Sequence, residues 1–318
     1  MGNPYSQLTL PERYQIQALS ELDFSARAIS RKLKRSNKTV SEELKRCPGG
    51  DYCAEVAHRH AGEKRQQAQK AQKCTGIVTR HVDWLLSLDL SPEQIAGRMQ
   101  VEDPAIAVSR QTIYRYVARK HWRARLPRKG KRYRQRQGAE AGVRLIPNRI
   151  DISERPEVVD ANSEMGHWEG DTVYGQDGYF VTLVERVSKL FLTLRVKNKT
   201  KAVVGKAVRK LLKPYQAICK TITFDNGGEF AGHQAIARAL KCKIYFAKPY
   251  HSWQRGLNEN TNGLLRRYFP KGMAIGSLSK RDVEQAVFAI NMRPRKALNY
   301  LCPYEYLAGK RVSLMLSI

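Results

Sequence analysis

Three carboxylates of the 318-residue sequence lie in predicted strands and a predicted helix, where they could bind a metal ion together. Asp171 lies in HWEGDTVYG, residues 167–175, whose β-branched and aromatic residues predict a strand. Asp225 ends a second predicted strand, TITFD, and Glu259 lies in a predicted helix, RGLNENTNGLLRRYF. A carboxylate in a buried strand needs a partner, and Mg²⁺ prefers hard oxygen ligands of this kind. The pattern therefore predicts a divalent-metal site.

The overall charge indicates what such a site would act on. The chain carries 57 Lys and Arg against 29 Asp and Glu, a formal net charge of +28, and its pI is about 10.0. This balance predicts a polyanionic partner, namely nucleic acid. No apolar run approaches the roughly 20 residues of a membrane-spanning helix, so no membrane partner is expected. Six scattered cysteines without a CxxC pair predict a reducing, cytoplasmic location.

The helix that carries Glu259 also offers groups that could hold a phosphate backbone. Glu259, Asn262, Gly263 and Arg266 recur at i, i+3, i+4 and i+7 and share one face. In that order, these residues offer a metal ligand, a side-chain amide, a glycine that lets a backbone approach closely, and a guanidinium. Four residues of this region are predicted to contact DNA: Asn258, Asn262, Arg266 and Lys271.

Other residues near the acids have structural alternatives. Glu169 shares the strand face of Asp171, which makes it an alternative auxiliary ligand. For Glu229, a structural role in the turn after Asp225 is preferred. His167 and His233 are interpreted as packed, hydrogen-bonded histidines rather than as DNA contacts. Cysteines and histidines between 47 and 74 match no standard zinc spacing, and whether they bind a metal stays open.

The elements around the acids predict an α/β domain. Three successive strands cover 167–175, 179–187 and 191–196, and a DGY turn joins the first two as a hairpin. A helix over 199–213, a strand ending at Asp225, a helix over 232–240, a strand over 241–247 and the Glu259 helix follow. This order is typical of an α/β layout, with sites at the carboxyl ends of its strands.

The amino-terminal part predicts a helix-turn-helix. Three short helices are expected within residues 7–46, and the last two are joined by a tight turn. The pairs Ile29 and Leu33, and Val40 and Leu44, would hold these helices together. The start of the last helix would then face a major groove with Ser36, Asn37, Lys38, Thr39 and Ser41. A generic helical bundle with a solvated charged face is the alternative.

A second helix-turn-helix is predicted within residues 81–120. SPEQIAGRM carries a capping-box pattern, and SRQTIYRYVARK begins with another Ser cap. Ile95, Met99, Ile113 and Val117 are predicted core. The outer face near the start of the last helix would contact DNA through Arg110, Gln111, Tyr114 and Arg115.

A dense basic run follows the second predicted helix-turn-helix. Residues 119–136 carry ten Lys and Arg and no acid, which predicts phosphate contacts and a steep salt dependence of DNA binding. The expected DNA contacts within it are Arg128, Lys129, Lys131 and Arg132. The expected division of the chain is 1–48 helix-turn-helix, 49–80 helical spacer, 81–120 second helix-turn-helix, 121–160 basic linker and 161–318 catalytic domain.

The order and spacing of four segments carry a resemblance to a known family. HWEGD, TFDNGGEF, PYHSWQRGLNENTNGLLRRYFPKG and NMRPRKALNYLCPYEYL resemble the DDE transposases of the insertion sequence 30 family. The 33 residues between Asp225 and Glu259 match that family's spacing. Two positions depart from its pattern: Glu42 stands where Arg is expected, and Lys248 where the family often has Asp. The first departure puts the base contacts in doubt, and neither affects the three acids.

The resemblance implies fold, chemistry and partners. It implies an RNase H-like domain with a mixed five-stranded sheet and flanking helices, preceded by helix-turn-helix domains. Asp171, Asp225 and Glu259 would fill the family's three acidic positions and hold two Mg²⁺ ions, with Mn²⁺ as a substitute. The activity implied is DNA cleavage and strand transfer at terminal inverted repeats, into target DNA, by a homodimer or larger homo-oligomer in the bacterial nucleoid. Two alternatives stay open: a DNA-binding regulator with an inactive domain, and a nuclease acting on RNA hybrids.

Overall fold

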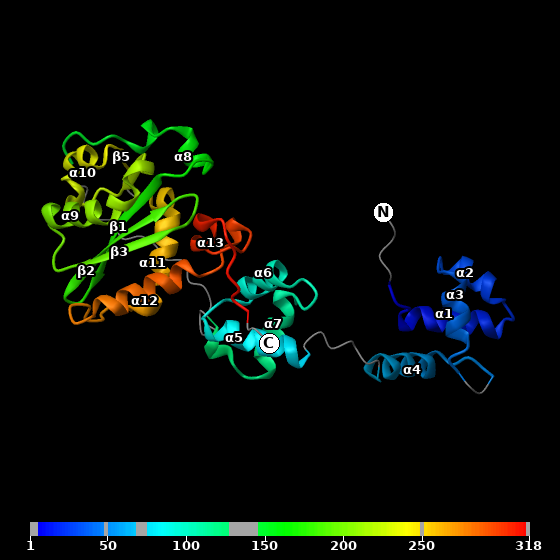
Figure 1. Ribbon diagram of the computed structural model, residues 1–318. Coiled ribbons are helices and arrows are strands. Elements are labelled where there is room, and N and C mark those ends of the chain that lie inside the picture. Colours follow the sequence, from blue (N-terminus) through cyan, green and yellow to red (C-terminus); the bar gives the residue numbers. More distant parts are fainter. Residues whose placement is uncertain (1–5, 48–49, 68–74, 127–145, 249–250, 316–318) are drawn as a thin grey trace. The chain divides into compact units, whose positions relative to one another are not determined.

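The computed structural model describes residues 6–47, 50–67, 75–126, 146–248 and 251–315. The chain divides into two compact units, residues 1–72 and residues 73–318 (Figure 1). The first unit is helical, and the second contains a helical group followed by a sheet with helices on both faces. No helix within the described ranges is long and apolar enough to cross a membrane.

The first unit is built from four helices around a small apolar core. These are α1 (Leu10–Glu21), α2 (Ala26–Lys32), α3 (Asn37–Leu44) and α4 (Ala54–Gln67). Thr9, Ser25 and Ser36 cap the first three by accepting a backbone N–H of the first turn. Ile29 and Val40 are fully buried in the core, with Leu33 and Leu44 packed against it, which confirms the predicted apolar pairs.

The second unit begins with three helices, α5 (Gly76–Ser87), α6 (Pro92–Glu102) and α7 (Arg110–Arg119). Ser91 and Gln94 form the predicted capping box at the start of α6. The predicted core residues are confirmed, because Ile95, Met99 and Ile113 have no exposed surface and Val117 almost none. The helical group therefore has a core of its own.

The sheet has five strands in the order β3-β2-β1-β4-β5. The strands are β1 (His167–Gly175), β2 (Gly178–Glu185), β3 (Phe191–Val196), β4 (Thr221–Phe224) and β5 (Lys243–Phe246). The first three pair antiparallel, while β4 and β5 run parallel to β1. The predicted mixed sheet is confirmed.

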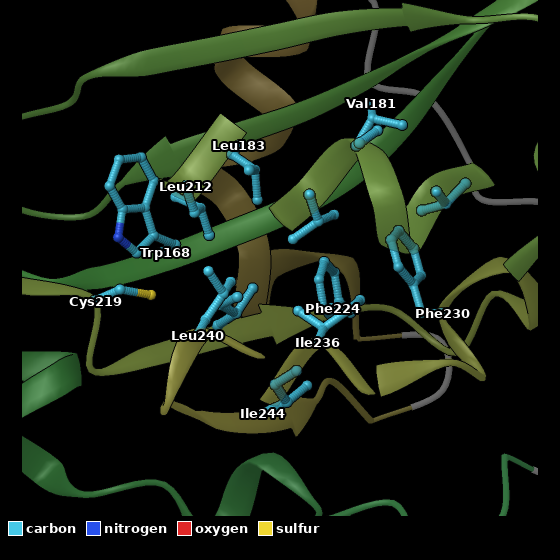
Figure 2. Close-up of a cluster of buried hydrophobic side chains, with 14 of the residues drawn as sticks. Trp168, Val181, Leu183, Leu212, Cys219, Phe224, Phe230, Ile236, Leu240 and Ile244 are labelled. Atoms are coloured by element: carbon cyan, nitrogen blue, oxygen red, sulfur yellow. The ribbon is translucent and has the colours of Figure 1, made fainter. Parts of the chain in front are cut away.

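Helices cover both faces of this sheet. One face packs against α9 (Lys201–Leu212) and α10 (His233–Leu240), and the other against α11 (Gly256–Tyr268) and α12 (Lys280–Asn291). Figure 2 shows the first of these cores, where Trp168 of β1 and Phe224 of β4 lie among apolar side chains. Because side chains alternate along a strand, the odd-numbered residues of β1 face α11.

The carboxyl-terminal residues return to the helical group. After α13 (Pro303–Ala308), Leu314 and Met315 pack against the core of α5, α6 and α7. The indole N–H of Trp84 donates to the Leu314 carbonyl at 2.9 Å. Arg98 of α6 has no exposed surface and forms two hydrogen bonds, at 2.7 and 2.6 Å, with the Glu305 carboxylate of α13. These contacts tie the helical group to the end of the chain within the second unit.

Candidate active site

Two of the predicted acids come together because their strands are neighbours. The parallel pairing of β1 and β4 places Glu169 opposite Thr223. Two residues farther along each strand, this register brings Asp171 beside Asp225, which directly follows β4. Asp171 therefore lies in the middle of β1, just past its parallel pairing with β4, and Asp225 lies at the carboxyl end of β4. Both carboxylates are on the face covered by α11.

A guanidinium that the sequence did not indicate lies between these carboxylates. Arg255, at the start of α11, has one terminal nitrogen, Nη2, 3.2 Å from Oδ2 of Asp225. Its other terminal nitrogen, Nη1, lies 3.8 Å from Oδ1 of Asp171 and donates to the Gly170 carbonyl at 2.8 Å. The side chain is only 12% exposed. The two acids thus share one positive charge.

Asp171 sits in an environment that disfavours its charge. Burial raises the pKa of Asp171 to about 6, Arg255 opposes the rise, and Asp225 and Glu229 add to it. Two donors hold the carboxylate: the backbone N–H of Thr172 at 2.8 Å, and the side-chain amide of Asn262 at 2.9 Å. A carboxylate whose pKa is raised by burial and by a neighbouring carboxylate is typical of a functional site.

Glu259 lies on α11, one turn before Asn262, and its side chain is exposed. Within the described ranges, no three His, Cys, Asp or Glu residues are close enough to hold one ion in this conformation. The structure therefore pairs Asp171 with Asp225, and it places Glu259 on the helix that also contacts Asp171 through Asn262.

The donor set fits a hard divalent cation. Asp171 and Asp225 supply carboxylate oxygens at a place that already attracts a cation, since Arg255 lies there. The side-chain oxygen of Asn262 is buried and has no hydrogen-bond partner within the described ranges. These residues could hold Mg²⁺ once Glu259 turns toward them.

Glu169, considered as an auxiliary ligand, has another role in the structure. It is 1% exposed and forms a buried ion pair with Arg186. Its second oxygen accepts the backbone N–H of Asn258 at 3.0 Å. Since the N-cap residue Arg255 makes no side-chain capping bond, Glu169 caps α11 from β1. This pair fixes the helix that carries Glu259.

The other residues near the acids are held by neighbours. Glu229 accepts the hydroxyl of Thr172 at 2.8 Å, which fits the structural role preferred for it. His167 is buried and lies 2.9 Å from the Thr221 hydroxyl. His233 is buried 3.3 Å from the carbonyl of Asn148.

The predicted DNA contacts fall into four groups. In the first unit, Ser36, Asn37 and Lys38 are exposed, but the Ser36 hydroxyl caps α3; Thr39 and Ser41 are half-buried. On α7 the predicted face is exposed along Arg110, Gln111, Tyr114 and Arg115. Near α11, Lys271 is exposed, while Asn262 and Arg266 are half-buried. The basic residues Arg128, Lys129, Lys131 and Arg132 lie outside the described residues.

One prediction in this set is wrong. Asn258 has no exposed surface, because its side chain points under β2, where its oxygen lies 3.4 Å from the Thr182 hydroxyl. A side chain without exposed surface does not contact DNA in this conformation. Asn258 directly precedes Glu259, and one residue turns an α-helix by about 100°, which directs the Asn258 side chain toward the sheet.

The cysteine and histidine cluster of the first unit is only partly described. Cys47 contacts the backbone of Cys53, with its sulfur 3.4 Å from the Cys53 nitrogen. His58 lies 3.1 Å from the Arg13 guanidinium. Cys74 lies outside the described residues.

Family models match two parts of the chain. Residues 161–252 match an integrase core domain, and residues 4–47 match a helix-turn-helix domain. The first range contains Asp171 and Asp225, and the second contains α1, α2 and α3.

The chain is similar to curated proteins along most of its length. It is 37% identical to the transposase for insertion sequence element IS4351 of Bacteroides fragilis, over 94% of each chain. It is 33% identical to the transposase InsI for element IS30C of Escherichia coli K12, covering 94% of this chain and 83% of the relative. It is 31% identical to the transposase for element IS1086 of Cupriavidus metallidurans, covering 96% of this chain and 95% of the relative.

A solved structure, the catalytic core domain of BIV integrase, also matches part of the chain. The match has 20% identity and a TM-score of 0.36, and it covers 45% of this chain and 95% of that domain.

Proposed function

Because the chain belongs to the IS30 family of insertion-sequence transposases, we propose that it cuts DNA at the ends of its element and joins them to a target. The helix-turn-helix of the first unit would bind the terminal inverted repeats. The RNase H-like domain would carry out the cleavage and strand transfer. The proposal commits to an active enzyme rather than to a regulator, because all three acidic positions of the family pattern are occupied.

One observation carries the catalytic part of this proposal. Asp171 and Asp225 come from neighbouring strands, lie on the same face, and together attract a guanidinium. Two carboxylates held side by side repel each other, so a cation between them, or a proton on one of them, stabilises the arrangement. This pair, on neighbouring strands and with a cationic group already beside both members, supports a metal-binding role.

We assign the three acids to the binding of two Mg²⁺ ions. Asp171 would contact both ions, Asp225 one and Glu259 the other. When bound, the ions would activate the attacking oxygen and stabilise the leaving oxygen of an in-line displacement at phosphorus. Asn262 holds the Asp171 carboxylate in orientation through its amide, at 2.9 Å. No side chain needs to act as the nucleophile: water would attack first, and the freed 3′-hydroxyl second.

The helical parts would bring DNA to this site. We propose that α3 reads the terminal repeat through its exposed first turn, and that α7 contacts DNA through Arg110, Gln111 and Arg115. Arg266 and Lys271 would contact phosphates near the acids. At least a dimer is expected on DNA, because two element ends must be joined to one target.

The direct test replaces one acid without changing its shape. Glu259→Gln is expected to lower cleavage of a duplex carrying the terminal repeat by more than about a hundredfold, because a metal ligand is lost. Binding of the repeat, measured by gel shift, should stay within twofold of the wild type. The matched control is Glu284→Gln, an exposed carboxylate on α12 that pairs only with Lys280 at 3.4 Å within the described ranges. The assignment of Glu259 is wrong if Glu259→Gln cuts at the wild-type rate with Mg²⁺.

A further inference from the structure

A cavity of about 480 Å³ opens beside the acid pair, at the start of α11. Gly256 and Leu257 of the first helical turn form part of its wall. Charged side chains form much of the rest, and none of them was a predicted site residue apart from Glu169. They are Arg155, Arg186, Lys189, Lys248, Asp160 and Glu169.

The charges of this cavity do not balance. Its lining has four cations and two carboxylates. Arg155 pairs with Asp160, and Arg186 pairs with Glu169. Two lysines are left over. The ammonium group of Lys189 donates to the Arg186 carbonyl, and Lys248 has no carboxylate within ion-pair distance in the part of the chain that the structure describes.

The surplus charge is partly buried. Arg155 is 8% exposed, and its Nε is buried without a hydrogen-bond partner within the described ranges. Burial, and then the neighbouring Arg186, lower the pKa of both Arg155 and Lys189. The buried cations Arg155 and Arg186 are already paired, whereas Lys189 is half-buried and Lys248 is exposed. The cavity therefore presents positive charge in excess of its carboxylates, which an anion would neutralise.

The position of the cavity connects it to the acids. Arg155 donates to the Thr223 hydroxyl at 2.9 Å, and Thr223 lies two residues before Asp225 on the same strand face. Glu169 likewise lies two residues before Asp171. Two residues of strand span about 7 Å. An anion in the cavity would thus lie one short step along the sheet from the acid pair.

We propose that this cavity binds a phosphate group, and that in the working protein the group is a DNA backbone phosphate next to the one being cut. The planar guanidinium of Arg155 and the ammonium groups of Lys189 and Lys248 are donors suited to phosphate oxygens. The assignment to DNA rests on the proposed function. Phosphate binding itself needs neither metal nor cleavage.

The first experiment measures phosphate binding alone. The full chain, in buffer with EDTA, is titrated calorimetrically with inorganic phosphate and with pyrophosphate. Lys248→Gln and Lys189→Gln should each weaken binding at least fivefold. Lys248 is exposed, so its replacement leaves the fold intact. The control is Lys206→Gln, an exposed lysine on α9, which covers the other face of the sheet; it should bind as the wild type does. Equal binding by the wild type and the Lys189→Gln, Lys248→Gln double variant would overturn the site.

The second experiment identifies the source of the phosphate. Single backbone phosphates around the cleavage position are replaced by neutral methylphosphonates, and duplex binding is measured without metal. At one position beside the cleaved phosphate, the methylphosphonate should weaken duplex binding by the wild type at least fivefold. The same replacement should not change duplex binding by the Lys189→Gln, Lys248→Gln double variant. If no position behaves so while a mononucleotide competes with pyrophosphate, the occupant is a free nucleotide and the DNA assignment is wrong. Failure of the proposed function would appear separately, as cleavage retained by Glu259→Gln.

Discussion

Replacing Glu169 by Gln tests how strongly the buried pair with Arg186 fixes the helix that carries Glu259. The change keeps the shape of the side chain and removes its charge. Arg186, 9% exposed, would then keep only the Val159 carbonyl at 3.0 Å and the exposed Asp160 carboxylate at 3.7 Å. Breaking a buried ion pair from one side costs about 3 to 5 kcal/mol.

The expected loss lies at the lower end of that range. The amide oxygen of Gln can still accept the Asn258 N–H, so the cap of α11 is weakened rather than lost. A free energy of unfolding lower by about 3 kcal/mol, with an m-value of about 2 kcal/mol per molar urea, moves the urea midpoint down by about 1.5 M. The assay is urea unfolding of the full chain followed by circular dichroism, with hydrogen exchange reporting the Asn258 amide.

Two further variants separate this cause from others. Glu164→Gln removes a carboxylate that is 41% exposed and paired with Lys220, and should lower the urea midpoint far less than Glu169→Gln does. The double variant Glu169→Gln, Arg186→Met removes both charges, keeps an acceptor for the Asn258 N–H, and should recover part of the loss. The reasoning is refuted if Glu169→Gln costs no more than Glu164→Gln, or if the double variant is less stable than Glu169→Gln.

Two other predictions concern the acid pair itself. The unfolded chain ionises Asp171 near pH 4 and the folded protein near pH 6, so the folded state binds more protons between these values and stability falls as pH rises through this window. In EDTA at pH 7.5, the free energy of unfolding of Asp171→Asn should therefore exceed that of the wild type by about 1 to 3 kcal/mol, and at pH 5 by less. The same stability difference at both pH values would count against the raised pKa. Arg255→Gln removes the cation that lies between the acids, so Mn²⁺ should bind the DNA-free protein severalfold more tightly by electron paramagnetic resonance, whereas Arg238→Gln, exposed on α10, should have no effect. Weaker Mn²⁺ binding by Arg255→Gln would show that the arginine supports the site instead of competing with the ion.

Much of the fold follows from local patterns in the sequence. Runs rich in β-branched, apolar and aromatic residues predicted β1, β2 and β3, and the strand endings predicted that Asp171 and Asp225 would meet. Capping residues such as Ser91 and Ser109 predicted where helices begin. These signals act over a few residues, which is why a single sequence reveals them.

The rest depends on contacts between residues far apart in the chain. Arg186 meets Glu169 across the sheet, and Arg98 meets Glu305 more than two hundred residues away. The residues next to these two arginines in the sequence do not distinguish them from the many exposed arginines. Arg255, four positions before Glu259, was missed for the same reason, because its partners Asp171 and Asp225 lie far from it in the sequence. Asn258 shows the reverse error, because a helical face cannot be assigned to within one residue from sequence alone.

The return of Leu314 and Met315 to the core of α5, α6 and α7 has a consequence for synthesis of the protein. The ribosome makes these three helices well before it makes the residues that close their core, so the group exposes apolar surface to water until Leu314 and Met315 have been synthesised. A stop codon between α13 and Leu314 would thus damage a group of helices encoded far upstream of it.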